Sequence, residues 1–395
     1  MTRMVGTTAR GIRTPIVRQG DDLVQIVVDS LLDAAKAENF SLRDRDVIGV
    51  TESLLARAQG NYVSLEAIAS DVKEKFPGDL VVLFPILSRN RFAMILKALA
   101  LTGKKITVML NFPSDEVGNH LMDVDKMEER SINPYADVLT EEDYRIAFGH
   151  SFKHPFTGLD YIDLYKNLSV DNNIEIVLAN DYQAALTYSQ DVLVANIHDR
   201  IKLKKKLLAA GARTALGLDD IINEPVRDSG FNPEYGLLGS NQAGSDRLKL
   251  FPRDCQPFVE AVQNKLNEQT GKKIEVMVYG DGAFKDPQGK IWELADPVVS
   301  PGFTEGLKGT PNEIKMKYIV DNELSELSRS EMVDALRDKI RSKGTDLVGQ
   351  AESAGTTPRQ LTDLLGTLCD LMSGSGDKGT PVILIQGYFD NYAVD

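Results

Sequence analysis

Two segments in the last third of the chain carry the residue types of a metal–nucleotide site. In the first, an apolar strand pattern over residues 276–279 runs into Gly280-Asp281-Gly282. In the second, a helical pattern ends in a loop over residues 373–379, and an apolar strand pattern follows. A carboxylate at a strand end offers the oxygen ligands that Mg²⁺ or Mn²⁺ prefers, and glycines let backbone N–H groups approach phosphate. This pairing predicts a phosphate-using enzyme.

Simpler interpretations of these segments remain open at this point. An aspartate between two glycines after a strand is most often a turn residue. The loop is not a P-loop, because Lys378 precedes Gly379 and no helix follows. A serine or cysteine nucleophile and a zinc site both lack a recognisable motif.

The composition is that of a globular protein with more than one domain. The chain has 395 residues, of which 42% are hydrophobic and 26% charged, and its net charge is −13. This length predicts two domains or one domain with a large insertion. The negative charge argues against nucleic-acid partners. Cys255 and Cys369 are expected to be buried free thiols, and the absence of an apolar leader or membrane span predicts a cytoplasmic protein.

The element pattern changes along the chain. A helix is expected to follow Gly20-Asp21-Asp22, and residues 46–51 are predicted to form a buried strand. Strands and helices alternate over residues 78–222, which predicts a largely parallel sheet. No dinucleotide-type glycine motif follows these strands. The loop over residues 150–158, with two histidines and two phenylalanines, either packs on the core or contacts substrate.

Four segments in order resemble a known enzyme family. They are residues 14–23, residues 46–60, Leu238-Gly239-Ser240-Asn241 and residues 371–387. Together with the strand before Asp281, they resemble the coenzyme F-420-0:L-glutamate ligases, also called F-420 γ-glutamyl ligases. The chain is similar to a divergent and enlarged bacterial-type member of that family.

The resemblance implies a set of site residues. Asp281 and Gly282 would contribute to metal binding, with Mg²⁺ or Mn²⁺ as the metal. The chain departs from the family at Arg57, where lysine is usual, and at Leu238, where an aspartate metal ligand is expected. Asp246, Asp286 and Glu293 are carboxylates that could replace that aspartate. The implied nucleotide-binding residues are Thr14, Pro15, Ile16, Val17, Glu52, Ser53, Arg57, Asn241, Ser373, Gly374, Ser375, Gly376, Asp377, Lys378 and Gly379.

The expected fold is mixed α/β. Residues 1–66 and 236–395 would form a discontinuous ligase domain, and residues 67–235 would form an inserted α/β segment, either an elaborated substrate-binding part or an added domain. The resemblance implies a GTP- or ATP-dependent amide ligase that adds L-glutamate to a cofactor-like carboxylic acid through an acyl phosphate, and it suggests a homodimer. The acceptor would be a deazaflavin, a folate-like cofactor or another acid. Two alternatives are an inactive nucleotide- or cofactor-binding paralogue, which Leu238 favours, and an unrelated α/β enzyme.

Overall fold

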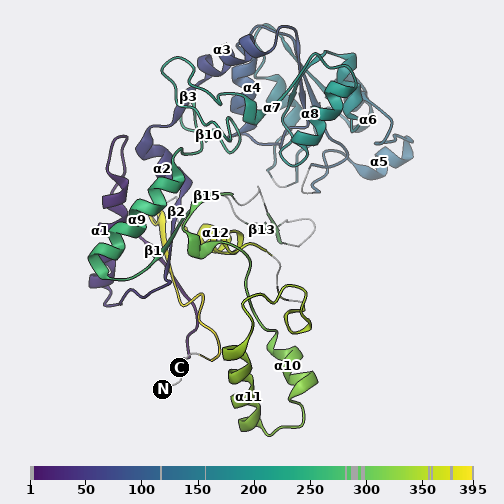
Figure 1. Ribbon diagram of the computed structural model, residues 1–395. Coiled ribbons are helices and arrows are strands. Elements are labelled where there is room, and N and C mark those ends of the chain that lie inside the picture. Colours follow the sequence, from purple (N-terminus) through teal and green to yellow (C-terminus); the bar gives the residue numbers. More distant parts are fainter. Residues whose placement is uncertain are drawn as a thin grey trace. The chain divides into compact units, whose positions relative to one another are not determined.

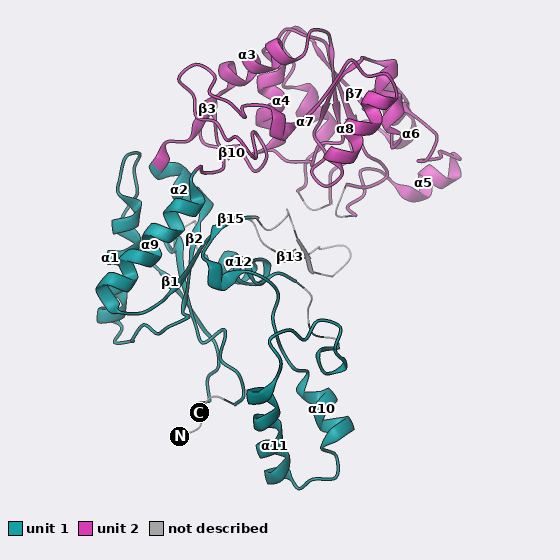
Figure 2. Cartoon of the chain, in the orientation of Figure 1, with its two compact units in different colours: residues 1–58, 254–283, 294–395 teal, residues 59–253, 284–293 magenta. Residues whose placement is uncertain are grey.

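The computed structural model divides the chain into two compact units (Figures 1 and 2). Unit 1 comprises residues 1–58, 254–283 and 294–395, and unit 2 comprises residues 59–253 and 284–293. The residues that the structure describes are 4–115, 118–155, 157–280, 283–285, 292–294, 299–354, 356, 359–373 and 377–393. Mixed α/β architecture is confirmed in both units.

Unit 1 is built on a sheet with the strand order β1-β16-β2-β12-β15. Only the central pair, β2 and β12, is parallel; the other neighbours are antiparallel. The strands are β1 (Thr8–Ile12), β2 (Val47–Thr51), β12 (Glu275–Gly280), β15 (Val299–Phe303) and β16 (Val382–Gln386). The helices are α1 (Leu23–Ala37), α2 (Glu52–Gln59), α9 (Cys255–Thr270), α10 (Met316–Glu323), α11 (Arg329–Ser342) and α12 (Leu361–Met372).

Helices cover both faces of this sheet. Helices α1 and α9 pack on one face, against alternate strand residues such as Ile48 and Val276, whereas α12 packs on the other, against Val47 and Met277. This alternation is the period of two of a strand whose faces are both buried. The Asp22 side chain caps α1 by accepting a hydrogen bond from the backbone N–H of Gln25. Helices α10 and α11 form a hairpin with a small apolar cluster of its own.

Unit 2 contains a doubly wound sheet with the strand order β6-β7-β5-β4-β8-β9, in which every neighbouring pair except β6–β7 is parallel. Its strands are β4 (Leu80–Leu83), β5 (Ile106–Leu110), β6 (Leu139–Thr140), β7 (Ile174–Leu178), β8 (Asp191–Val194) and β9 (Thr214–Gly217). The helices are α3 (Leu65–Lys75), α4 (Phe92–Ala100), α5 (Val124–Glu129), α6 (Glu141–Phe148), α7 (Tyr161–Lys166) and α8 (Arg200–Ala209). The largely parallel sheet predicted from the sequence is confirmed.

The compact units divide the chain at different residues from the expected domains. Their junctions follow residues 58 and 253, whereas the sequence placed them after residues 66 and 235. The difference comes from a small sheet in unit 2, in which β11 (Arg247–Lys249) pairs with both β3 (Tyr62–Ser64) and β10 (Asn241–Gln242). The substrate-binding role of residues 67–235 stays a prediction. A further two-stranded sheet joins β13 (Ala283–Lys285) and β14 (Trp292–Leu294).

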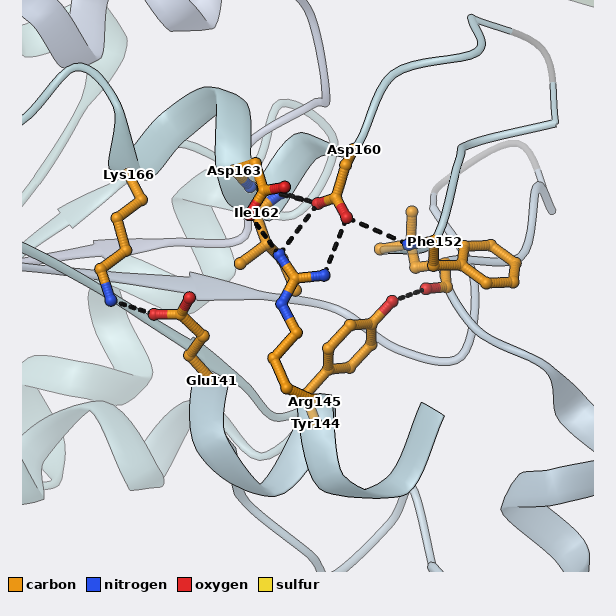
Figure 3. Close-up of polar contacts among 9 residues, drawn as sticks. Glu141, Tyr144, Arg145, Phe152, Asp160, Ile162, Asp163 and Lys166 are labelled. Atoms are coloured by element: carbon orange, nitrogen blue, oxygen red, sulfur yellow. Dashed lines mark hydrogen bonds and ion pairs between the residues drawn. The ribbon is translucent and has the colours of Figure 1, made fainter. Parts of the chain in front are cut away.

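A partly buried ionic cluster ties the histidine-containing loop of unit 2 to α6 and α7 (Figure 3). Arg145 donates to both oxygens of Asp160, at 2.8 and 3.3 Å, and also to Asp163. Asp160 in turn accepts from the backbone N–H of Phe152 at 3.0 Å. Although burial opposes it, the Arg145 guanidinium together with backbone N–H donors holds the pKa of Asp160 below its usual value.

The histidine at position 154 packs inside unit 2. Its side chain is 3% exposed, and its Nε2 lies 3.0 Å from an Asp115 carboxylate oxygen. Its ring also meets the Tyr161 ring edge-on. For this part of the loop the structure therefore supports packing on the core over contact with substrate; Phe156 lies outside the described residues.

Candidate functional site

Three strand ends of unit 1 come together where the sequence placed its candidate residues. The last residue of β2, Thr51, is the register partner of Tyr279, near the end of β12. The Thr51 backbone N–H donates to the Pro381 carbonyl at 3.1 Å, directly before β16 begins. The carboxyl ends of β2 and β12 and the residues preceding β16 therefore share one edge of the sheet. Glu52 starts α2 at this edge, and its neighbour Ser53 lines one pocket with Gly379 of the 373–379 loop.

A tight turn at Gly20 holds the entry segment (residues 14–23, the first of the four resembling segments) against α2. Gly20 has a φ of +87°, a conformation that favours glycine, and its N–H donates to the Ala58 carbonyl at 2.8 Å. Asp21 accepts from the backbone N–H of Arg18 at 2.7 Å. Val17 is 2% exposed and anchors the segment in the core. The segment before Val17 is thus fixed as a wall beside α2.

These elements enclose a pocket of about 260 Å³ within unit 1. The structure brings most of the sequence-predicted entry and α2 residues together with the loop residue Gly379. Three further lining residues, Thr51, Leu54 and Pro381, were not predicted from the sequence, although each lies within two positions of a predicted residue. The lining residues are Thr14, Pro15, Ile16, Val17, Thr51, Ser53, Leu54, Arg57, Gly379 and Pro381.

The chemistry of this pocket is that of an anion site with an apolar rim. Arg57 is exposed at the last turn of α2, so its guanidinium can turn toward a ligand with several donors. Ile16 is 82% exposed, although it lines the pocket beside Pro15. An exposed apolar side chain next to a cation suits a ligand with a flat apolar part and a charged part.

The pKa of the Tyr279 hydroxyl reflects the burial and the charges near the end of β12. Burial raises the pKa of its hydroxyl well above the usual value, and the nearby Asp370 and Glu52 carboxylates act in the same direction. The Ser373 side chain acts against this shift. Glu52 and Ser373, two predicted nucleotide-binding residues, thus both act on the pKa of this hydroxyl.

Close packing at Gly49 sets the position of α12, from whose end the 373–379 loop continues. A Cβ at Gly49 would lie 2.4 Å from the Cys369 Sγ and 3.1 Å from the Tyr279 ring. Only glycine lets α12 approach β2 this closely. Cys369 is fully buried, as the sequence predicted, and Cys255 is 5% exposed.

A larger open cavity, about 1140 Å³, adjoins the pocket and shares Thr14 and Pro15 with it. It runs between β1 and α1 and is also lined by Arg10, Arg13 and Lys378. Lys378 was predicted from the loop, whereas the two arginines were missed. Arg10 lies in β1 and Arg13 directly follows it, so their role can be recognised only once this strand is known to border a cavity.

The remaining nucleotide-binding candidate, Asn241, lies in unit 2, in β10. Its side-chain oxygen accepts from the Gln242 backbone N–H at 2.9 Å. Leu238, which stands where the resemblance expects an aspartate, is 7% exposed and belongs to the main apolar cluster of unit 2. Asp246, a possible substitute, is exposed in the same unit.

Most of the metal-site candidates lie outside the residues that the structure describes. Asp281 and Gly282 lie outside the described residues, as do Gly374, Ser375, Gly376 and Asp286; Glu293 is described only as backbone of β14. The residues that are described contain no group of three or more His, Cys, Asp or Glu side chains suited to a metal. Glu52 offers one carboxylate, which does not by itself satisfy Mg²⁺ or Mn²⁺.

The family model of the F420-0:gamma-glutamyl ligases matches residues 11–387, almost the entire chain. The chain belongs to this family. Membership supports a ligase that attaches glutamate to a cofactor, with small-molecule substrates. No curated protein matched the chain. Among the described residues, no helix has the length and apolar character needed to cross a membrane.

Proposed function

We propose that this member of the F420-0:gamma-glutamyl ligase family is a GTP- or ATP-dependent amide ligase. It would join the amine of L-glutamate to the carboxylate of a cofactor-like acceptor. The observation that carries this proposal is the pocket in unit 1, where Arg57 and Gly379 lie beside the Thr14–Val17 wall. These residues come from three distant parts of the sequence, and the family resemblance assigns all of them to the nucleotide.

The reaction we propose has two steps. An acceptor carboxylate oxygen bonds to the γ-phosphorus, the bond from that phosphorus to the bridging oxygen breaks, and the nucleoside diphosphate leaves. The glutamate amine then attacks the acyl carbon, phosphate leaves with the electron pair of the broken C–O bond, and the amine proton passes to solvent. Activation is required because oxide is a very poor leaving group.

The residues of this chain would act mainly by positioning and by neutralising charge. Arg57 would donate to phosphate oxygens, and the backbone at Gly379 would approach the same group. The Ile16–Pro15 rim would contact the purine. A divalent metal, when bound, would neutralise phosphate charge; Asp281 is the residue we propose for it. The pocket is smaller than a whole nucleotide, so the adjoining cavity beside Lys378 would receive the rest.

Nucleotide binding tests the site directly. We expect calorimetry to detect binding of a slowly hydrolysed GTP or ATP analogue in the presence of Mn²⁺. Arg57→Ala should weaken this affinity about tenfold, the lower end for a charge-assisted hydrogen bond because the side chain is exposed. Arg329→Ala is the matched control, since it removes an exposed arginine from α11 of the same unit. Wild-type protein that binds neither analogue would overturn the proposal.

Turnover tests the chemistry. With nucleotide, glutamate and a candidate acceptor, phosphate release should require both glutamate and the acceptor. Nucleotide binding without such turnover for deazaflavin, folate and simpler acids would favour the second candidate, an inactive binding paralogue. Leu238 is the observation that favours this alternative, because a buried leucine stands where the family resemblance expects a metal-binding carboxylate.

A homodimer remains part of the proposal. Strand β1 is an edge of its sheet and pairs with β16 on one side. An edge strand has backbone groups that can pair with a second chain. Light scattering coupled to size-exclusion chromatography should give twice the chain mass, and a monomer at all concentrations would remove the dimer from the proposal.

A further inference from the structure

The sheet of unit 2 reverses its strand order between β4 and β8. From β4 the chain proceeds outward through β5 to β7, then returns to place β8 on the other side of β4 and continues to β9. Helix α4 packs in the cluster on one face of the sheet, and α8 packs in the cluster on the other. Parallel sheets of this kind leave a crevice at the carboxyl ends of the two strands where the order reverses, and ligands bind there.

The loops that follow these two strands are shaped by their own side chains. After β4, the Ser88 hydroxyl accepts from the Phe92 backbone N–H at 2.9 Å, and the Ser88 N–H donates to the Tyr165 hydroxyl at 3.0 Å. After β8, the Asn196 side chain accepts from the Asp199 N–H at 2.6 Å. Both loops are therefore preorganised. Arg89 on the first and His198 on the second are exposed.

A second observation places residues 237–242 at the same edge. The segment containing Leu238-Gly239-Ser240-Asn241 is joined to the β4 loop by a 2.8 Å hydrogen bond from the Gln242 N–H to the Asn90 carbonyl. It is joined to the residue after β9 by a 2.9 Å bond from the Leu237 N–H to the Leu218 carbonyl. Within this segment the Ser240 side chain is buried, 2% exposed, and its hydroxyl has no hydrogen-bond partner among the described residues. Such a buried hydroxyl calls for a partner.

The polar groups at this edge exclude one common ligand and favour another. A dinucleotide site would need a glycine motif after β4 and an acidic residue at the end of β5, but the residue there is Asn111, which donates to Asn180. Arginine, histidine and amides instead suit an anion. Because the whole chain carries a charge of −13, an anionic ligand needs such a local basic site.

We propose that this crevice of unit 2, at the carboxyl ends of β4 and β8, binds the carboxylic-acid acceptor of the ligase. The proposal rests on the proposed function for the identity of the ligand, but its location rests on unit 2 alone. Arg89 would pair with an acidic group of the acceptor, Asn196 and His198 would contact its polar groups, and the Ser240 hydroxyl would gain a partner when the acceptor is bound.

Hydrogen exchange on the full chain locates the acceptor without requiring turnover. The probes are F420-0, the compound that the family is named for, and folate. We expect one of them to protect residues 84–91 and 195–200, and a nucleotide analogue to protect residues 14–17 instead. Protection of residues 10–17 by both probe and nucleotide, or no protection of the two unit 2 loops by either probe, overturns the proposal.

Two variants test the contacts. Arg89→Ala should weaken binding of the protecting probe about tenfold, as loss of a charge-assisted hydrogen bond predicts. Ser240→Ala should weaken it severalfold and leave thermal unfolding unchanged, because this hydroxyl has no partner to lose. Lys205→Ala, which removes an exposed charge from α8, is the control and should leave binding within twofold.

The outcomes separate this proposal from the proposed function. Unchanged probe affinity in both Arg89→Ala and Ser240→Ala overturns the acceptor crevice, whatever the nucleotide data show. Loss of nucleotide binding in Arg57→Ala with unchanged probe binding supports separate sites. Failure of the wild type to bind nucleotide, with the unit 2 loops still protected by probe, rejects the ligase and retains the crevice.

Discussion

The contact between β2 and α12 allows a quantitative test of how the candidate site is held in place. In Gly49→Ala, the new methyl group would lie 2.4 Å from the Cys369 Sγ, well inside van der Waals contact. Gly49 and Cys369 are both buried between the sheet and α12, so neither can move into solvent to relieve the clash. Overpacking of this kind costs about 1–3 kcal/mol. Helix α12 should move outward and carry the loop that begins at Ser373 with it.

A double variant separates the clash between the residue 49 methyl group and Cys369 from a general loss of packing. Cys369→Ala removes the clashing sulfur and by itself should cost on the order of 1 kcal/mol, as for other small buried truncations. In the double variant the alanine methyl occupies part of the space that the sulfur leaves. We expect the double variant to be about 1–2 kcal/mol more stable than the sum of the two single changes predicts.

Native-state hydrogen exchange of peptides from β12 and α12 is the appropriate assay, because it reports on unit 1 separately from unit 2. Nucleotide affinity should follow the same pattern, reduced by Gly49→Ala and largely restored by adding Cys369→Ala. If the unfolding free-energy changes of Gly49→Ala and Cys369→Ala are strictly additive, the contact between these residues is not the cause of the destabilisation. Coupled stabilities with unaffected nucleotide affinity would refute the link between α12 and the loop.

Three other predictions concern charged groups. Burial raises the pKa of Asp46, so its contribution to stability should fall as the pH rises through that pKa; Asp46→Asn should remove this decline in denaturant titrations at pH 4–7. Arg213 holds the pKa of the fully buried Asp191 low despite burial, so their pairing contributes stability above the unfolded pKa that is lost on acidification. Arg213→Ala should lower the stability of unit 2 at pH 7, by an amount limited because Arg213 is half exposed, and should flatten the acid side of its unfolding profile. Arg145→Ala leaves Asp160 buried without its cation, and should lower the stability of α6 and α7 by about 3–5 kcal/mol, measured by hydrogen exchange.

Local sequence patterns predicted most individual elements. The Asp22 cap and the apolar spacing after it predicted α1, and the alternation over residues 78–222 predicted the parallel sheet. These features depend on neighbours along the chain, which the sequence states directly. The first strand was missed: β1 ends at Ile12, before the expected entry segment, because it is stabilised by pairing with β16, more than 360 residues away.

The candidate site was predicted in part for the same reason. The order of motifs indicated that Thr14–Val17, Arg57 and Gly379 act together, and the structure places them around one pocket. Long-range pairing could not be read from the sequence, so Asn241 was assigned to the first domain, whereas β10 pairs with β11 inside unit 2. The roles of Asp281 and Gly282 stay predictions.

The last strand of the chain has a consequence for biosynthesis. Strand β16 lies between β1 and β2, so the sheet of unit 1 lacks an interior strand until residue 386 has left the ribosome. The six-stranded sheet of unit 2 is encoded by residues 80–217 and is complete long before that. The sheet of unit 1 therefore stays incomplete after the sheet of unit 2 can fold, and a premature stop codon within residues 382–386 would remove an interior strand rather than only shorten the chain.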